Sequence, residues 1–418
     1  MPEFREARLG DVADVRWGDT NTTKASYTPN GFTAFSASGP DGFLPHYDYD
    51  RTGIVLSAIG SECGKVWLAR GRWSCIKNTI RFFSNDPQVR TEYLYWLSNR
   101  EGFFPRRGSG QPFISQGDAR DCRVLIPDIK TQDAICELLG SLNDKIDINR
   151  RMNETLEAMA QAIFRDWFVD FGPVRRRLAG VTDPVVILGG LTTAPAAAAE
   201  LAALFPKGFD ASDLPMAWDE EPVIEQANWV NGAAYKKMHF VPPGEGLPVI
   251  KIAELKAGVT STTGFTNTDL GSRYRIDDGE LLFSWSGNPD TSIDTFIWTG
   301  GPAWLNQHIF AVRPNGSRTI GFLFAMLKYL NPQFAEIARD KQTTGLGHVT
   351  KEDLKRLRVV VPSKAVEAAF DKLMTPIFQK LQAALLENRT LAETRDYLLP
   401  RLISGEVSVG DAALEIAA

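Results

Sequence analysis

Cysteine and histidine are scarce in this chain, and the few that occur are not spaced as metal ligands. The 418 residues include four cysteines and four histidines, and neither set matches a zinc or redox pattern. We expect the cysteines to be buried thiols and the chain to hold no metal. The residues concerned are Cys63, Cys75, Cys122, Cys136, His46, His239, His308 and His348.

Long apolar runs are also missing. No stretch reaches the roughly 18 uncharged apolar residues that a membrane-spanning helix needs. The sequence begins with the charged run Met1–Glu6, which lacks the apolar core of a signal peptide. We therefore expect a cytoplasmic protein with no membrane contact.

The motifs of several catalytic classes are absent. An adenine methyltransferase needs a glycine-rich cofactor loop and an Asn/Asp-Pro-Pro-aromatic loop, whose nearest match here is Asn288-Pro289-Asp290. The phosphate-binding Gly-x-x-x-x-Gly-Lys-Ser/Thr loop is missing, and the acidic residues form no recognisable nuclease motif. We expect the chain to be no enzyme and to carry no cofactor.

Excess positive charge is lacking overall but present locally. The net charge is −5, which counts against a protein that simply coats nucleic acid. Residues 65–107 nevertheless hold nine basic and three acidic side chains, and residues 328–358 hold seven and four. Two basic stretches on an acidic protein are typical of a DNA reader that also docks protein partners.

The chain contains an internal repeat. With a shift of 235 residues, 110–118 lies over 345–353, and Arg123–Pro127 lies without a gap over Arg358–Pro362. The same shift superposes Lys145 on Lys380. Two copies are too few for a solenoid and predict a molecule with a pseudo-two-fold axis.

Each copy ends in a long helix with a seven-residue apolar period, which is typical of a coiled coil. At 1.5 Å per residue such a helix is about 50–60 Å long, which is more than a small domain needs. We expect the two helices to run antiparallel, with Asn149 opposite the small Ala384. The seam residues are Ile135, Leu142, Asn149, Leu156 and Ile163 in the first helix, and Phe370, Ile377, Ala384, Leu391 and Leu398 in the second.

A segment with predicted strands and short helices precedes each long helix. Strands are expected at 53–57 and 79–83, and again at 279–284 and 308–312, with short helices at 92–99 and 321–329. The predicted fold is therefore α+β: two α/β domains separated by a long antiparallel two-helix coiled coil. The expected boundaries are 1–130 and 218–362 for the α/β domains, 131–170 and 363–405 for the helices, 171–217 for a connector with one short helix, and 406–418 for a loose tail.

These features resemble the specificity subunit of type I restriction-modification systems. The second unit carries the most specific segments, Leu281–Gly287 and Trp304–Phe310, and the first has looser counterparts at Ser57–Ser61 and Ile76–Ile80. Further similar segments close the two long helices, at 162–168 and 399–405. One departure is that Leu9-Gly10-Asp11, which opens the first unit, has no clear counterpart near Trp218.

The resemblance implies a non-catalytic subunit that reads double-stranded DNA. It implies two target-recognition domains, each reading half of a bipartite target, and partners consisting of two methyltransferase subunits and the restriction (motor-nuclease) subunits. Methyl transfer from S-adenosylmethionine, and the ATP- and Mg-dependent steps of cleavage, would then belong to the partner chains.

Two kinds of segment are candidates for contact with DNA. Polar residues beside a predicted strand offer groups that pair with base edges. Two basic, glycine-containing loops at equivalent places offer phosphate contacts. The first kind comprises Lys77, Asn78, Asn306, Gln307 and His308, and the second comprises Arg106, Arg107, Ser109, Gln111, Lys341, Thr343, Thr344 and His348. For the strand-edge residues, hydrogen bonding that braces a turn or a strand edge is the alternative, and it has at least equal weight.

Two other functions remain open from the sequence. The long helices could belong to a coiled-coil scaffold without DNA preference, and a standalone DNA-modifying enzyme is a third reading. A DNA reader is distinguished from both by co-purification with a methyltransferase and by sequence preference on duplex DNA.

Overall fold

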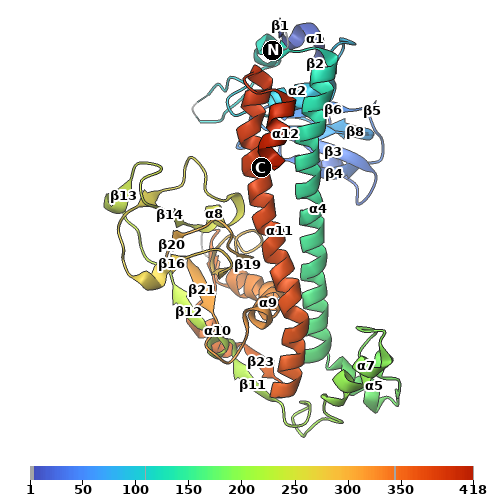
Figure 1. Cartoon of the computed structure of the whole chain (residues 1–418), viewed down its shortest axis with the longest axis vertical. Helices are drawn as coiled ribbons and strands as arrows, with labels where there is room; N and C mark the ends of the chain where they lie inside the picture. Colours follow the sequence, from blue (N-terminus) through green and yellow to red (C-terminus); the bar gives the residue numbers. More distant parts are fainter. Residues whose placement is uncertain (1–3, 109, 343–344, 418) are drawn as a thin grey trace. The chain divides into compact units, whose positions relative to one another are not determined.

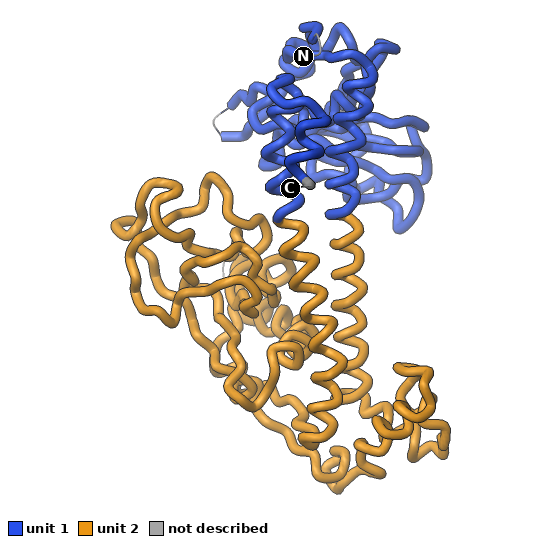
Figure 2. Tube along the Cα trace, in the orientation of Figure 1, with its two compact units in different colours: residues 1–146, 390–418 blue, residues 147–389 orange. Residues whose placement is uncertain are grey.

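The computed structural model describes residues 4–108, 110–342 and 345–417. The chain forms two compact units, residues 1–146 with 390–418 (unit 1) and residues 147–389 (unit 2) (Figure 2). Two long helices, α4 (Ile129–Phe168) and α11 (Lys364–Ser404), each contribute residues to both units (Figure 1). Within the described residues, no helix is apolar over a length sufficient to cross a bilayer.

Unit 1 is built on two four-stranded sheets, in the orders β2-β9-β6-β7 and β4-β3-β8-β5. The first sheet is antiparallel, and the second contains a parallel pair, β3 with β8. The strands are β2 (Ala13–Trp17), β3 (Phe32–Ser36), β4 (Gly39–Leu44), β5 (Tyr49–Asp50), β6 (Gly53–Ser57), β7 (Val66–Ala69), β8 (Arg72–Cys75) and β9 (Thr79–Ser84). A separate pair, β1 (Arg5–Arg8) with β10 (Arg123–Ile126), leads into α4.

Strand β6 is buried on both faces, which explains its uninterrupted apolar sequence. Ile54 and Leu56 face the main core, where the short helices α1 (Leu9–Val12), α2 (Thr91–Ser98) and α3 (Gln116–Asp121) also pack. Val55 points to the other side, against Trp73 of the second sheet. Alternation of side chains along a strand places these neighbours in different clusters.

Unit 2 repeats this topology. The sheet β12-β21-β17-β19 corresponds to β2-β9-β6-β7, and β13-β15-β14-β20-β16 again contains one parallel pair, β14 with β20. A pair formed by β11 (Asp219–Pro222) and β23 (Arg358–Val361) leads into α11. The remaining strands are β12 (Asn228–Asn231), β13 (Phe240–Val241), β14 (Leu247–Ile250), β15 (Phe265–Thr266), β16 (Arg275–Ile276), β17 (Leu281–Ser284), β18 (Ser286–Gly287), β19 (Asp294–Ile297), β20 (Ala303–Leu305), β21 (Ile309–Arg313) and β22 (Gly347–His348); the short helices are α8 (Ile252–Ala257) and α10 (Lys351–Arg356).

The structure shows which residues of unit 2 correspond to Leu9-Gly10-Asp11, the segment that opens the first unit. The Leu9 amide donates to the Cys122 carbonyl at 2.8 Å, and the Val223 amide donates to the Leu357 carbonyl at 2.8 Å. Leu9 begins α1, and Val223 begins the 3-10 turn η2 (Val223–Gln226). The repeat therefore extends to the first strand of each unit, and the predicted α+β fold with its internal repeat is confirmed.

The long helices run antiparallel, as predicted. In unit 1, Ile135 and Leu139 of α4 share a core cluster with Leu398 and Leu402 of α11. In unit 2, Phe164 packs against Phe370, with 6.1 Å between the ring centroids. The predicted seam residues are buried or half-buried in both helices.

Asn149 lies within the helix pair of unit 2 and is 1% exposed. Its amide nitrogen donates to Glu387 Oε2 at 2.7 Å and to Asn388 Oδ1 at 3.0 Å. These partners lie one turn beyond Ala384, the residue expected opposite it. A buried amide with fixed partners favours one register over its neighbours.

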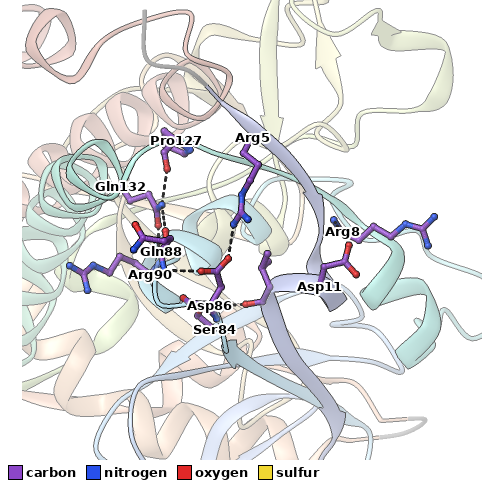
Figure 3. Close-up of polar contacts among 10 residues, drawn as sticks. Arg5, Arg8, Asp11, Ser84, Asp86, Gln88, Arg90, Pro127 and Gln132 are labelled. Atoms are coloured by element: carbon purple, nitrogen blue, oxygen red, sulfur yellow. Dashed lines mark hydrogen bonds and ion pairs between the residues drawn. The ribbon is translucent and has the colours of Figure 1, made fainter.

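A buried polar side chain attaches the first turn of each long helix to its α/β domain. In unit 1, Gln132 accepts from the Arg90 amide at 2.8 Å and donates to the carbonyls of Gln88 and Pro127, each at 2.9 Å (Figure 3). The position 235 residues later is Glu367, which pairs with the buried Arg318 at 2.8 Å. The same place in both copies therefore holds a polar anchor, neutral in one and charged in the other.

Two expectations for the segments outside the repeat were wrong. The connector holds three helices, α5 (Gly172–Leu178), α6 (Pro184–Ile187) and α7 (Pro195–Ala203), because Phe171, Phe205 and Trp218 pack into the core of unit 2. The tail is not loose: α11 ends at Gly405, whose φ is 74°, and α12 (Val409–Ala417) follows. Val407 and Ala412 are buried in the core of unit 1.

The helix expected at 321–329 is longer than predicted. α9 spans Ile320–Asp340 and continues through Pro332. Its buried face includes Phe334 and Ala338 beyond the proline. Packing of that face against the unit 2 core outweighs the local cost of proline.

Candidate nucleic-acid interface

Three segments of unit 1 meet where the central strand β6 ends. The Ala58 amide donates to the Asn78 carbonyl at 3.0 Å, and the Ile114 amide donates to the Ala58 carbonyl at 2.8 Å. The Gly60 amide donates to the Pro112 carbonyl at 3.0 Å. The loop after β6 therefore joins the β8–β9 turn to the basic segment at 105–113, so the structure brings the two sets of predicted residues together.

Unit 2 assembles the equivalent segments in the same way. The Trp285 amide lies 3.4 Å from the His308 carbonyl, and the Val349 amide donates to the Trp285 carbonyl at 2.8 Å. Ser286 of β18 pairs with His348 of β22. Each unit thus presents one polar surface built from a post-strand loop, a turn between strands and a basic segment.

In the unit 1 turn, Lys77 is exposed and forms no ion pair among the described residues. Asn78 has a φ of 70°, a left-handed conformation that asparagine adopts more readily than most residues. Asn78 therefore has a structural reason for its position, whereas the Lys77 side chain is exposed and unpaired among the described residues.

The three polar residues of the unit 2 turn divide into two roles. The Asn306 side chain is 7% exposed, and its backbone N–H donates to the Ile250 carbonyl at 3.0 Å, so the backbone of Asn306 braces the turn. Gln307 and His308 are exposed, with 3.3 Å between Gln307 Nε2 and His308 Nε2. These two side chains are the ones that present hydrogen-bonding groups outward.

Trp285 connects His308 and His348. Its ring centroid lies 5.5 Å from that of His308 and 6.5 Å from that of His348. The indole nitrogen donates to Asn231 Oδ1 at 2.9 Å, which fixes the ring. Trp285 thus supports two candidate contact residues from separate segments.

Arg107 and Lys341 are tied to equivalent carboxylates. Arg107 pairs with Asp118, and Lys341 Nζ lies 2.5 Å from Asp353 Oδ1. Each aspartate is the third residue of a short helix and forms a capping box with the N-cap residue, which is Ser115 for α3 and Thr350 for α10. These cations hold the basic segment to a helix start, a role that the sequence analysis did not assign to them.

The two capping aspartates are held ionised by their partners. Hydrogen bonds from Ser115, and then the Arg107 charge, lower the pKa of Asp118. Burial alone would raise the pKa of Asp353, but hydrogen bonds from Lys341 and Thr350 outweigh it and lower that pKa.

Arg106 and Gln111 are exposed in the unit 1 segment. Ser109, Thr343 and Thr344, which were also predicted to contact DNA, lie outside the described residues.

Two glycines at this surface were missed by the sequence analysis. A Cβ atom at Gly18 would lie 2.3 Å from Thr79 Oγ1 and 2.7 Å from the Ile76 carbonyl oxygen. At Gly232 it would lie 2.1 Å from the Asn306 carbonyl oxygen. A glycine just after β2 and again just after β12 was the available signal, because such glycines mark a close approach of two backbones.

We expect Gly18→Ala to destabilise unit 1 by about 1–3 kcal/mol, since the methyl group has no room beside the β8–β9 turn. Thermal unfolding followed by circular dichroism measures this loss. Gly140→Ala is the matched control, because nothing lies within 4 Å of its Cβ position in the α4 helix, and helix propensity predicts a gain of up to about 1 kcal/mol. Equal unfolding temperatures for the two variants would contradict the close approach of Gly18 to the β8–β9 turn.

The cysteines are free thiols: Cys63, Cys75 and Cys122 are buried, and Cys136 is half-buried. Burial raises the pKa of Cys75 and Cys136 to about 12, so neither forms a thiolate near neutral pH. In the parts of the chain that the structure describes, no group of three or more His, Cys, Asp or Glu side chains is placed to hold a metal ion.

Comparison with known proteins identifies the class. The family model of the type I restriction modification DNA specificity domain matches residues 1–158 and 224–393. The chain belongs to this family, and its function class is recognition of DNA sequence. The family match covers both copies of the repeat and leaves out residues 159–223 and 394–418.

Individual relatives agree with this assignment. The chain is 27% identical over 351 residues to the type I restriction enzyme HindI specificity subunit of Haemophilus influenzae, a match that covers 76% of this chain and 74% of that protein. It is 22% identical over 377 residues to the MjaIX specificity subunit of Methanocaldococcus jannaschii, covering 85% and 78%.

A solved structure shares the fold. The S subunit of the type I restriction-modification system from M. genitalium matches with a TM-score of 0.55 and 17% identity, over 96% of each chain. At this identity the likeness shows the fold alone.

Proposed function

We propose that this specificity subunit reads a bipartite DNA target, with one recognition surface in each unit. The observation that carries the proposal is the equivalence of the two surfaces: each is formed by a loop after the central strand, a turn with exposed polar side chains, and a basic segment held to a capped helix. Two equivalent readers in one chain match a target with two halves. The long helices act as the spacer, so unread base pairs separate the halves, at roughly one helical turn between centres or somewhat more.

The proposal includes protein partners. Two methyltransferase subunits dock on the helical pair, and restriction subunits join the complex. Methyl transfer from S-adenosylmethionine, and the ATP- and Mg-dependent steps, take place in those chains. Exposed apolar side chains on α4 support a docking role: Ile148 is 54% exposed and Met159 is 47% exposed. Their spacing of eleven residues, three helical turns, puts them on one face.

Variants of the two turns test the assignment of one half-site to each unit. We expect Gln307→Ala with His308→Ala to relax preference in one half of the target, at a cost of about 1–3 kcal/mol for each lost bidentate base contact. Lys77→Ala should act on the other half alone. The measurement is selection of bound duplexes from a random pool by the chain assembled with its methyltransferase.

Asn306→Ala is the structural control for that experiment, since the Asn306 side chain is buried, whereas Gln307 and His308 are exposed. It should lower the unfolding temperature, which the exposed Gln307 and His308 changes should not. If a variant of one turn relaxed the sequence preference in both halves of the target, the proposal would be contradicted. Absence of any sequence preference in the wild-type complex would favour the scaffold reading.

A further inference from the structure

A small basic pocket lies beside the recognition surface of unit 1. It has a volume of about 170 Å³, and its charged lining residues are Lys65, Arg100, Arg106 and the acidic Glu101. Lys65 follows the post-strand loop, and Arg106 belongs to the basic segment. The pocket is therefore formed in part by two of the three segments that make up the recognition surface.

Arg100 is a half-buried cation with no carboxylate partner among the described residues. Its Nε atom donates to the Leu97 carbonyl at 3.0 Å, which closes α2, and its guanidinium lies 5.5 Å from the ring centroid of Phe103. Burial lowers the pKa of this guanidinium. An anion in the pocket would offset the cost of holding the charge away from water.

Arg106 differs from its neighbour Arg107. Arg107 is paired with Asp118, whereas Arg106 has no ion-pair partner in the described parts of the chain. Its guanidinium lies against the Gly64 backbone, where a Cβ would come within 2.9 Å of Nε and Nη2. The glycine thus leaves room for a second guanidinium in the pocket.

We infer that this pocket binds a phosphate of the DNA backbone flanking the half-site that unit 1 reads, an inference that rests on the proposed function. Guanidinium groups bind phosphate oxygens with two parallel hydrogen bonds. Two of them line this pocket, and neither forms an ion pair among the described residues, although Glu101 lines the pocket as well. The post-strand loop leads to Gly64 and Lys65 of the pocket, and its backbone hydrogen bonds from Ala58 to Asn78 and from Gly60 to Pro112 join it to the segments that carry Lys77 and Gln111. DNA bound to those segments would bring its backbone to the pocket.

Among the described residues at the end of α9 in unit 2, the corresponding cations are paired. Arg339 lies 2.8 Å from Asp290, and Lys341 lies 2.5 Å from Asp353. Neutralised cations release few counterions on binding DNA. At this place we therefore expect unit 1 to release more counterions than unit 2, which presents Gln307 and His308 beside Trp285.

The test is the salt dependence of binding by the full chain to a random-sequence DNA duplex, measured by fluorescence anisotropy. Arg100→Gln and Arg106→Gln should each reduce the slope of log affinity against log salt by about 1, the value for one lost phosphate contact. Arg339→Gln, whose cation is paired, should keep the wild-type slope. Arg100→Lys keeps a positive charge and should recover most of the slope.

An unchanged slope in both Arg100→Gln and Arg106→Gln, with unfolding temperatures at the wild-type value, would overturn the inference. Arg106 is exposed, so its variant keeps the test valid if Arg100→Gln unfolds. An unchanged slope together with lost methyltransferase co-purification would also overturn it and assign the pocket to a partner's carboxylate. If the wild-type chain binds no duplex at any salt concentration, the proposed function itself fails.

Discussion

Replacing residues 1–127 with the equivalent domain of another specificity subunit should change one half of the DNA target and leave the other half intact. The cut keeps β1 and β10 together, since Arg5 pairs with Ile126 across that strand pair. It also falls before Gln132, whose hydrogen bonds to the Gln88 and Arg90 backbones attach α4 to the domain (Figure 3). The readout is the consensus of methylated sites in DNA from cells that express the hybrid with its methyltransferase.

The reciprocal replacement of residues 219–362 is the matched control. It likewise keeps a strand pair together, because β11 and β23 both lie inside it. It should change the half that the first hybrid preserved. A single replacement that altered both halves would show that the units do not read independently.

Glu367→Ala should destabilise unit 2 by about 3–5 kcal/mol, because it leaves the buried Arg318 without its counter-charge. The Arg318 and Glu367 side chains are 1% and 6% exposed, and Nη1 lies 2.8 Å from Oε1. Arg318 Nε also donates to Gln226 Oε1 at 2.9 Å, so the pair belongs to a buried network at the start of α11. Chemical denaturation measures the loss of unfolding free energy.

An exposed pair provides the control for that measurement. Glu352→Ala removes the partner of Lys355, and both side chains are more than half exposed, so the expected cost is about 0–1 kcal/mol. Replacing both buried partners, Arg318→Met with Glu367→Leu, should recover much of the stability lost in the single variant. Similar costs for Glu367→Ala and Glu352→Ala would contradict the assigned role of the buried pair.

The architecture was predictable because its signals are local or repeated. The apolar run at 53–57 became β6 at those residues, and the heptad pattern became α4 and α11. The 235-residue shift located the second unit, and it also relates Gln132 to Glu367 and Asp118 to Asp353. The antiparallel direction followed from the pseudo-symmetry of two equivalent ends.

The roles of individual charges were not predictable in the same way. Arg106 and Arg107 are adjacent and identical in type, yet only Arg107 meets a buried carboxylate. The capping-box spacing Ser115-x-x-Asp118 was visible, but nothing in it indicated which arginine would pair with the aspartate. The partners of Asn149 and Arg318 lie far along the chain, so only packing identifies them.

The helices of the connector and the packing of the tail were not predicted, because the composition of these segments does not indicate which residues are buried. Alanine is the most frequent residue in 171–217, and the aromatic residues Phe171, Phe205 and Trp218 are spaced so that they meet only in three dimensions. In the tail, Val407 and Ala412 are small and few, yet both are buried. Short segments with few apolar residues fold when a neighbouring core offers them a surface.

The central claim, that this chain reads a two-part target for a partner that methylates it, is tested most directly by mapping methylated adenines in DNA from cells expressing the chain with its cognate methyltransferase. The account predicts methylation at a single gapped consensus, two specific blocks separated by unspecified base pairs, and no such methylation when this chain is omitted. A continuous, ungapped consensus, or the same methylation without this chain, would contradict it.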